Sequence, residues 1–208
     1  MSPFRPFGDQ AGAPPAPNPH YSAYVCYPAA FSGVECDRIT SLFAPAGMGP
    51  GTVGTEGTGE SRLRRSRVGW LSWRPEVDWI FAKLLDFARL ANDTIYHFDI
   101  SGLDDDLQLT EYQPGDYYDW HQDAGPGPYT TRKLSLSLVL TDAREHQGGR
   151  LRFPDGVIPA TGSDALALAH PVKGTLILFP SYQLHRVDPV TSGTRRSLVA
   201  WLSGPPFR

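Results

Sequence analysis

Residues 174–201 read GTLILFPSYQLHRVDPVTSGTRRSLVAW, and this stretch decides the fold class. An apolar run at 174–180 is followed by a short segment at 183–187 and by a run at 195–202 in which apolar and polar residues alternate. Alternation with a period of two predicts β-strands with one buried face. Between them, VDPVTSG is rich in turn-forming residues, so we expect the last strand to return beside the segment that holds His185.

Helical signals precede the strands. Ser32 and Glu35 form a capping box, and Pro75 opens a second helix that is expected to run to about Asn92. The apolar stripe of the first helix is expected to consist of Val34, Ile39, Leu42 and Phe43. The expected strands are 95–100, 107–113, 116–121, 133–141, 150–153, 165–169, 174–180, 183–187 and 195–202. Helices followed by many short strands predict an α+β domain, either an antiparallel sandwich or an open barrel with helices covering one sheet.

Composition narrows the class of protein. The chain has 208 residues and a net charge of −3, so a broad nucleic-acid-binding groove is not expected. No run approaches the ~18 apolar residues that a membrane helix requires, so a membrane partner is not expected either. Cys26 and Cys36 make no disulfide framework, which favours a reducing, cytoplasmic location. Residues 1–20 are rich in proline and predict a flexible leader, and residues 21–208 are expected to form one domain. The glycine-rich segment 45–61 is interpreted as a mobile loop, either a lid or an irregular connection.

The sharpest chemical signal is His121-Gln122-Asp123. Residues i and i+2 of a strand point to one face, so an imidazole and a carboxylate converge there. His185 is the leading candidate for a third ligand. Together the three residues would form the 2-His-1-carboxylate facial triad of non-haem Fe(II) sites. His-x-Asp alone is a weak signal, because a surface histidine and aspartate give the same pattern.

The last strand offers an anion-binding group. Arg195 lies ten residues after His185, and the turn-rich connection between them brings the two close together. A guanidinium at this position can hold a carboxylate through two hydrogen bonds. Ser197 and Trp201 share the strand face of Arg195, whereas Arg196 lies on the other face. Parity alone does not decide between Arg195 and Arg196, and a surface arginine paired with an acidic loop remains the alternative.

Two tyrosines precede the His-x-Asp pattern. Tyr112 and Tyr118 lie nine and three residues before His121. A phenol near the arginine can donate a second hydrogen bond to an anionic ligand. Core aromatic residues at strand positions explain the same pattern, and for Tyr118 the two interpretations have equal weight.

These motifs together resemble a known family. Tyr-x-x-Gly-x-x-Tyr-x-x-His-x-Asp (112–123), GGRLRF (148–153) and the stretch 174–201 are similar to the prolyl 4-hydroxylase-like branch of the 2-oxoglutarate and Fe(II)-dependent dioxygenases. The similarity covers roughly 24–204 and includes FSGVECDRI (31–39), which resembles the first helix of that branch. The resemblance implies a double-stranded β-helix, or jelly roll, with supporting helices.

The resemblance also implies roles for single residues. His121, Asp123 and His185 match the iron ligands. Arg195 and Tyr112 match residues that hold the distal carboxylate of 2-oxoglutarate. Ser197 is similar to the serine of an Arg-x-Ser pair in other branches, and Tyr118 and Trp201 are candidates for substrate contacts. The implied cofactors are Fe(II), 2-oxoglutarate and O2, with ascorbate as a reductant. Four histidines match no ligand position and are expected on the surface or in loops, namely His20, His97, His146 and His170.

The implied reaction is hydroxylation of an unactivated C–H bond with release of succinate and CO2. Related halogenases lack the metal carboxylate, so Asp123 favours hydroxylation, while desaturation and ring formation use the same ligand set. A peptidyl proline or another peptide side chain is the first substrate expected, followed by a free amino acid or a natural-product intermediate. The segment 124–133 and the basic cluster Arg64, Arg65 and Arg67 are candidates to line the site, although such a cluster is often a solvated face.

Other functions fit parts of the pattern. A cupin-like metalloenzyme shares the barrel and the histidine ligands but does not use 2-oxoglutarate, and Arg195, Tyr112 and the spacing argue against it. A non-catalytic binding module of the same fold would be marked by loss of a ligand. A nucleic-acid demethylase is disfavoured by the acidic charge balance. The sequence leaves the oligomeric state open.

Overall fold

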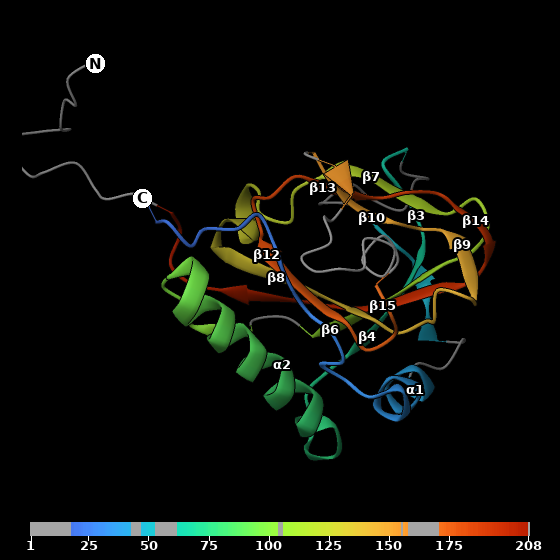
Figure 1. Ribbon diagram of the computed structural model, residues 1–208, viewed down its shortest axis with the longest axis horizontal. Coiled ribbons are helices and arrows are strands. Elements are labelled where there is room, and N and C mark those ends of the chain that lie inside the picture. Colours follow the sequence, from blue (N-terminus) through green and yellow to red (C-terminus); the bar gives the residue numbers. More distant parts are fainter. Residues whose placement is uncertain are drawn as a thin grey trace, which may run out of the picture.

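The computed structural model describes residues 18–42, 47–52, 62–103, 106–154, 156–157 and 171–207. Within these residues most strands belong to two antiparallel sheets that face each other, and the helices lie outside the larger sheet (Figure 1). This arrangement confirms the α+β class and the jelly-roll expectation. No helix in the described part of the chain is both long enough and apolar enough to span a bilayer.

The larger sheet has eight strands. In spatial order they are β1 (Val25–Tyr27), β12 (Leu176–Pro180), β8 (Arg132–Val139), β15 (Arg195–Ser203), β6 (Leu107–Tyr112), β4 (Arg67–Leu71) and β2 (Gly49–Pro50), with β5 (Gly102–Leu103) beside β15. The alternating run at 195–202 thus becomes a central strand, paired with β8 on one side and β6 on the other. The last strand does double back, as the turn-rich connection predicts.

The smaller sheet has five strands. They are β11 (Gly156–Val157), β10 (Leu151–Phe153), β13 (His185–Val187), β7 (Tyr117–His121) and β3 (Arg64–Arg65). A separate two-stranded ribbon pairs β9 (His146–Gly148) with β14 (Val190–Gly193). The turn-forming residues at 188–194 predict only a connection, whereas the structure has the strand β14 there. His146, expected on the surface or in a loop, lies in β9 and is half-buried.

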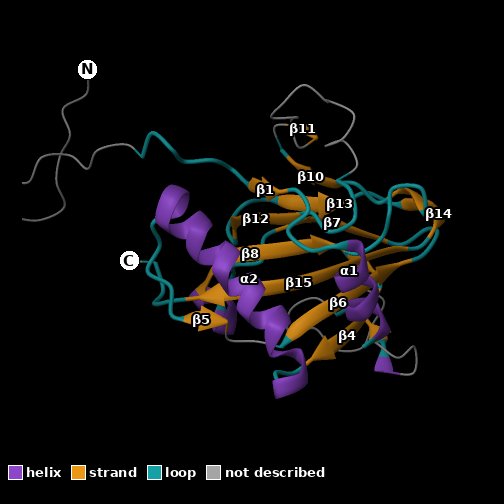
Figure 2. Cartoon of the chain, turned by 60° about the horizontal axis from the view of Figure 1, so that its bottom comes forward, coloured by secondary structure: helices purple, strands orange, loops and turns teal. Residues whose placement is uncertain are grey.

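Two helices cover the outer face of the larger sheet (Figure 2). They are α1 (Gly33–Ser41) and α2 (Asp78–Ala91), the second preceded by a 3₁₀ turn, η2 (Pro75–Val77), and followed by a π-helical turn, η3 (Asn92–Tyr96). The capping box at Ser32 and Glu35 is present. Val34 was expected in the apolar stripe of α1 but is 79% exposed, whereas Cys36 is buried. Phe43 lies outside the described residues.

The strand expected at 95–100 is wrong. The helix instead continues through η3 to Tyr96, and His97 adopts a left-handed conformation with φ of 55°. The Asn92 side chain bonds the backbone N–H and C=O of Phe98, which closes this irregular turn. Ile95, Tyr96 and Phe98 all pack onto the core from this turn, without forming a strand.

Alternation in the large sheet separates two apolar clusters. One face of β8 and β15 carries leucines that pack against the two helices, including Leu136, Leu138 and Leu198. The opposite face looks toward the smaller sheet, where a second cluster includes Phe153 and Phe179. Complete burial of a leucine side chain contributes about 1.5–3 kcal/mol relative to exposure, so the helix-facing cluster stabilises the fold. The inner face carries this smaller cluster together with polar residues such as Arg195 and Ser197.

Several expected features lie outside the described residues. Of the proposed leader 1–20, only 18–20 are described. The proposed strand at 165–169 and His170 are not described. Of the glycine-rich segment 45–61, residues 47–52 are described, and they include β2, which pairs with β4. The division into a leader and a domain, and the lid, stay predictions.

Candidate metal site and its pocket

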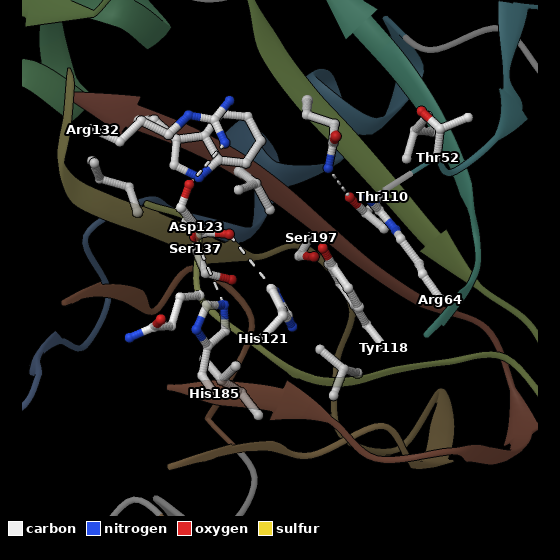
Figure 3. Close-up of a pocket in the computed structure, with 18 of the residues that line it drawn as sticks. Thr52, Arg64, Thr110, Tyr118, His121, Asp123, Arg132, Ser137, His185 and Ser197 are labelled. Carbon is white, nitrogen blue, oxygen red and sulfur yellow. Dashed lines mark hydrogen bonds and ion pairs between the residues drawn. The ribbon is translucent and has the colours of Figure 1, made fainter. Parts of the chain in front are cut away.

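His121, Asp123 and His185 meet at one place between the two sheets (Figure 3). His121 ends β7, and His185 begins β13 as its direct cross-strand partner. Each imidazole Nε2 lies 3.7 Å from one oxygen of the Asp123 carboxylate. The three ligand atoms all lie within 4.8 Å of one another. A single cation can therefore contact all three.

Hydrogen bonds orient both candidate histidine ligands. His121 Nδ1 lies 2.7 Å from the backbone oxygen of Asp119, and His185 Nδ1 lies 2.9 Å from that of Gln183. A carbonyl oxygen only accepts, so each Nδ1–H must donate. The Nε2 lone pairs then point to the centre of the cluster. Second-shell bonds of this kind orient imidazoles in metal sites.

Asp123 is held by its own set of bonds. The backbone N–H groups of Asp123 and Ala124 both donate to the Ser181 carbonyl at 2.9 Å. The Ser135 hydroxyl donates to Asp123 Oδ2 at 2.6 Å. Asp123 follows the end of β7 rather than lying within it, so these bonds, and not strand alternation, set its position. Ser135 was not among the predicted site residues, although the alternation of Leu and Ser in β8 indicates that its serines share one face.

The electrostatics of the cluster fit a divalent cation. Burial opposes ionisation of Asp123, but the imidazoles of His185 and His121 and the Ser135 hydroxyl outweigh it and hold the pKa of this carboxyl below its ordinary value. Burial and the neighbouring His185 lower the pKa of His121 to about 4. The cluster thus offers an anionic oxygen and a neutral imidazole at neutral pH. Two imidazoles and one carboxylate are the donor set of non-haem Fe(II) sites with open positions.

A cavity of about 650 Å³ opens beside the three ligand residues. Arg195, Ser197 and Trp201 line it, as expected from the shared face of β15. Arg195 is 7% exposed, and its guanidinium donates to Ser197 Oγ at 3.1 Å. No carboxylate of the described residues forms an ion pair with Arg195. Arg196 lies on the opposite face and donates to Glu111 at 2.8 Å, so it does not reach the cavity.

The double glycine before β10 makes room for Arg195. Gly149 has a φ of +65°, and a Cβ atom there would lie 2.7 Å from Arg195 Cδ. A side chain at this position would displace the arginine and strain the backbone. The close approach of Arg195 therefore explains the need for glycine at position 149 of the GGRLRF motif. Burial lowers the pKa of Arg195, but an arginine stays protonated near neutral pH.

The expected aromatic residues also reach the cavity. Tyr112 faces Arg195 in register across β6 and β15, with the guanidinium carbon 5.2 Å from the ring centre. Tyr118 stacks on the His121 ring with centroids 3.4 Å apart. Arg132 lies over Trp201 at 3.9 Å, near Asp123. Tyr112, Tyr118 and Trp201 are therefore in contact with the cavity and are not only core residues.

The structure divides the basic cluster that sequence analysis treated together. Arg64 is 8% exposed and lines the cavity. Arg65 points to solvent and pairs with Asp116 at 3.1 Å. Arg67 pairs with Glu111. Part of the segment 124–133 also lines the cavity, as expected from its position after Asp123.

Comparisons with known proteins agree with this geometry. The family described as the 2OG-Fe(II) oxygenase superfamily matches residues 107–203. A PKHD-type hydroxylase of Idiomarina loihiensis is 32% identical over 96 residues, which are 46% of this chain and 41% of that protein. The chain thus spans about two fifths of the length of the curated relatives it matches.

Solved structures share the fold over most of the chain. A viral collagen prolyl hydroxylase from Paramecium Bursaria Chlorella virus-1, in a 2OG complex, has a TM-score of 0.64 at 22% identity and covers 88% of this chain and 97% of its own. A prolyl hydroxylase from Trichoplax adhaerens, in complex with a hypoxia inducible factor peptide fragment, has a TM-score of 0.65 at 15% identity and covers 87% and 83%. The region 107–203, which carries all three candidate ligands and Arg195, is thus similar to the 2OG-Fe(II) oxygenase superfamily and to PKHD-type hydroxylases, and the chain shares the fold of prolyl hydroxylases.

Proposed function

We propose that the chain is a non-haem Fe(II) and 2-oxoglutarate-dependent dioxygenase that hydroxylates a C–H bond of a peptide side chain or an amino acid. The observation that carries this proposal is one cavity that holds both a cluster of three metal-ligand groups and the buried Arg195. The first suits Fe(II) and the second suits a carboxylate. Neither a cupin-like enzyme that does not use 2-oxoglutarate nor a binding module needs that combination.

Each site residue has a proposed task. His121, Asp123 and His185 would hold the iron, with their second-shell bonds fixing the donor atoms. Arg195 would bind the distal carboxylate of 2-oxoglutarate, with Tyr112 and Ser197 beside it. Tyr118 and Trp201 would contact the substrate. When bound, Fe(II) supplies the redox chemistry by which O2 and 2-oxoglutarate convert C–H to C–OH, giving succinate and CO2.

The protein side of this reaction is positioning and exclusion of water. Walls from both sheets surround the cavity, and Phe179 and Leu151 contribute apolar surface to it. Apolar walls strengthen the interaction between a guanidinium and a carboxylate because water does not screen it. Ascorbate would act as an auxiliary reductant. Both cysteines are free thiols, which supports a reducing, cytoplasmic setting.

The peptide or amino-acid substrate rests on the likeness to prolyl hydroxylases. The Trichoplax adhaerens protein was solved with a peptide fragment, and similar proteins carry the name hydroxylase. In this proposal Asp123 supplies the metal carboxylate, which favours hydroxylation over halogenation. We therefore propose a peptide, protein or amino-acid-like substrate, and neither a nucleic acid nor a membrane as partner.

Anaerobic difference absorption tests the cofactor set. Fe(II) and 2-oxoglutarate are added to the metal-free protein, singly and together, and the visible charge-transfer band of the iron chelate is recorded. We expect a band that requires both additions and is absent in Asp123→Ala. The exposed Asp119→Ala variant is the matched control and should keep the band. Succinate formation under air then measures turnover.

Each other outcome rejects the proposal in a defined way. A folded protein that binds iron but gives no band with 2-oxoglutarate would favour the cupin-like alternative. A folded protein that binds no iron would favour a non-catalytic binding module. A band that survives Asp123→Ala would show that the ligand assignment is wrong.

A further inference from the structure

The cavity contains a second buried arginine that the cofactor set does not use. Arg64, at the end of the smaller sheet in β3, is 8% exposed and lines the cavity. Its guanidinium carbon lies 4.7 Å from the ring centre of Tyr118, which itself stacks on His121. Figure 3 shows the same order, with Tyr118 between His121 and Arg64. The guanidinium is thus one aromatic ring away from a metal ligand.

Arg64 is held in place by its surroundings. Its Nε donates to Ser66 Oγ at 2.8 Å. A Cβ atom on Gly51 would lie 2.7 Å from Nε and 3.0 Å from the guanidinium carbon, so only a glycine leaves space there. The Gly51 N–H donates to the Ser66 carbonyl at 2.9 Å, which fixes this close approach. The guanidinium is therefore preorganised, with the Gly51 backbone and the Tyr118 ring against it.

The outer end of this guanidinium has no partner in the described part of the chain. No carboxylate there forms an ion pair with Arg64, and only Nε has a hydrogen bond. Its terminal nitrogens are not sealed from solvent, and the residue lines the cavity. A buried arginine without a counter-charge is costly unless a ligand supplies one. The four unused N–H donors point to an anionic ligand.

Charge balance points the same way. Asp123 is the only carboxylate among the described residues that line the cavity, against three arginines, Arg64, Arg132 and Arg195. Under the proposed function, Fe(II) and Arg195 are balanced by Asp123 and the two carboxylates of 2-oxoglutarate. Arg132 stacks on Trp201 and lies 3.5 Å from the Asp123 carbonyl. The charges of Arg132 and Arg64 are left over in this balance; Arg132 takes part in these and other contacts, whereas the terminal nitrogens of Arg64 have no partner among the described residues and are available to an anionic substrate group.

We propose that Arg64 binds a carboxylate of the substrate, so that the enzyme acts on a free amino acid or on the C-terminal residue of a peptide rather than on an internal residue. This inference rests on the proposed function, because it assigns Arg195 to 2-oxoglutarate. A guanidinium can grip a carboxylate with two parallel bonds. From its place beyond Tyr118, Arg64 would hold the substrate backbone while the side chain extends toward the metal ligands.

A binding panel tests the substrate class without turnover. The probes are the free amino acids, alanyl dipeptides ending in the same residues, and the C-terminal amides of both sets. Calorimetry is performed anaerobically on the protein loaded with Fe(II) and 2-oxoglutarate. We expect at least one free acid to bind and its amide to bind at least tenfold more weakly. Binding of amino acids distinguishes a small-molecule substrate from a peptide C-terminus, which only the dipeptides represent.

Variants connect the selectivity to Arg64. Arg64→Gln should reduce the ratio of acid affinity to amide affinity to about one. Arg64→Lys keeps the charge but loses the pair of parallel N–H donors, so it should keep part of this ratio. Arg65→Gln is the matched control, because the neighbouring Arg65 is exposed and pairs with Asp116 outside the cavity. This control should retain the full ratio. Circular dichroism confirms that each variant is folded.

Three results would overturn the inference. One is that the amides bind with the same affinity as the acids. Another is that no probe in the panel binds in an Arg64-dependent manner. The third is that Arg64→Gln weakens the binding of 2-oxoglutarate as much as the binding of the acid probe, which would place Arg64 in the cosubstrate site. Failure of the proposed function is recognised separately, because the chelate band itself would then be missing.

Discussion

His121 and His185 are direct cross-strand partners, with their ring centroids 4.1 Å apart. The two residues are far apart in sequence, and the antiparallel pairing of β7 with β13 brings them together. Backbone carbonyls at Asp119 and Gln183, each two residues before its histidine, accept the Nδ1–H bonds. Two strands thus present the two candidate ligands with equivalent hydrogen bonds, and the proposed metal site is a consequence of strand register.

His185→Ala should abolish tight Fe(II) binding. The variant leaves one imidazole and one carboxylate, and two ligands do not form a facial site. Metal affinity can be measured by anaerobic competition with a chromophoric chelator. His97→Ala is the control, because His97 is exposed and should leave the affinity unchanged. Unchanged affinity in His185→Ala would remove this residue from the ligand set.

Arg195→Gln should weaken 2-oxoglutarate binding about 10- to 100-fold, because a hydrogen bond to a charged group contributes roughly 1.5–3 kcal/mol. The dissociation constant follows from an anaerobic titration of the Fe(II)-loaded protein. Arg196→Gln is the matched control: it breaks the pair with Glu111 on the opposite face and should lower only stability. The reverse pattern, with Arg196→Gln weakening binding, would shift the assignment by one residue.

Ser135→Ala should lower metal affinity about 10- to 100-fold, as loss of a second-shell partner does. The hydroxyl donates to the Asp123 carboxylate at 2.6 Å and helps to fix its orientation. The same chelator competition measures the effect. Ser137→Ala, two residues further along the same strand face, should change metal affinity less than twofold. Equal effects from both serines would argue that general packing, and not the bond to Asp123, is responsible.

The sequence predicts the inner face of β15 correctly because alternation leaves little freedom in a paired central strand. Leu198 and Leu202 must pack against the helices, so Arg195 and Trp201 must face the cavity. Parity could not choose between Arg195 and Arg196 until the apolar face was known. Burial of the leucines is the physical fact that decides it.

Features that depend on particular side-chain contacts or strand pairings could not be predicted in the same way. The strand expected at 95–100 failed because Asn92 closes a helical turn with Phe98, a local bond that a hydrophobic pattern does not show. The ribbon strand β14 pairs with β9, and turn-forming residues hide it. Arg64 and Arg65 look alike in sequence, yet contact with Gly51 and Tyr118 buries only the first.

The capping box of α1 should give a pH-dependent contribution to stability. A hydrogen bond from Lys83, at 2.8 Å, and bonds to Ser32 lower the pKa of Glu35 below its ordinary value. A carboxyl with a depressed pKa stabilises the folded state above its unfolded pKa, about 4.3, and this contribution is lost as pH falls through the folded pKa. Glu35→Gln should therefore be less stable than the wild type at neutral pH, with a difference that shrinks below about pH 4.

Urea unfolding of α1 variants between pH 3 and 7 measures this difference. Ser32→Ala should lower the free energy of unfolding by about 0.5–2 kcal/mol, because the Ser32 hydroxyl accepts a hydrogen bond from the Glu35 N–H at any pH in this range. Asp86→Asn is the control, because Asp86 and Arg89 form an exposed pair on α2 in which both side chains are more than 70% accessible. If the difference in unfolding free energy between the wild type and Glu35→Gln stays constant down to pH 3, the substitution acts only through packing, and the charge of Glu35 does not stabilise the helix.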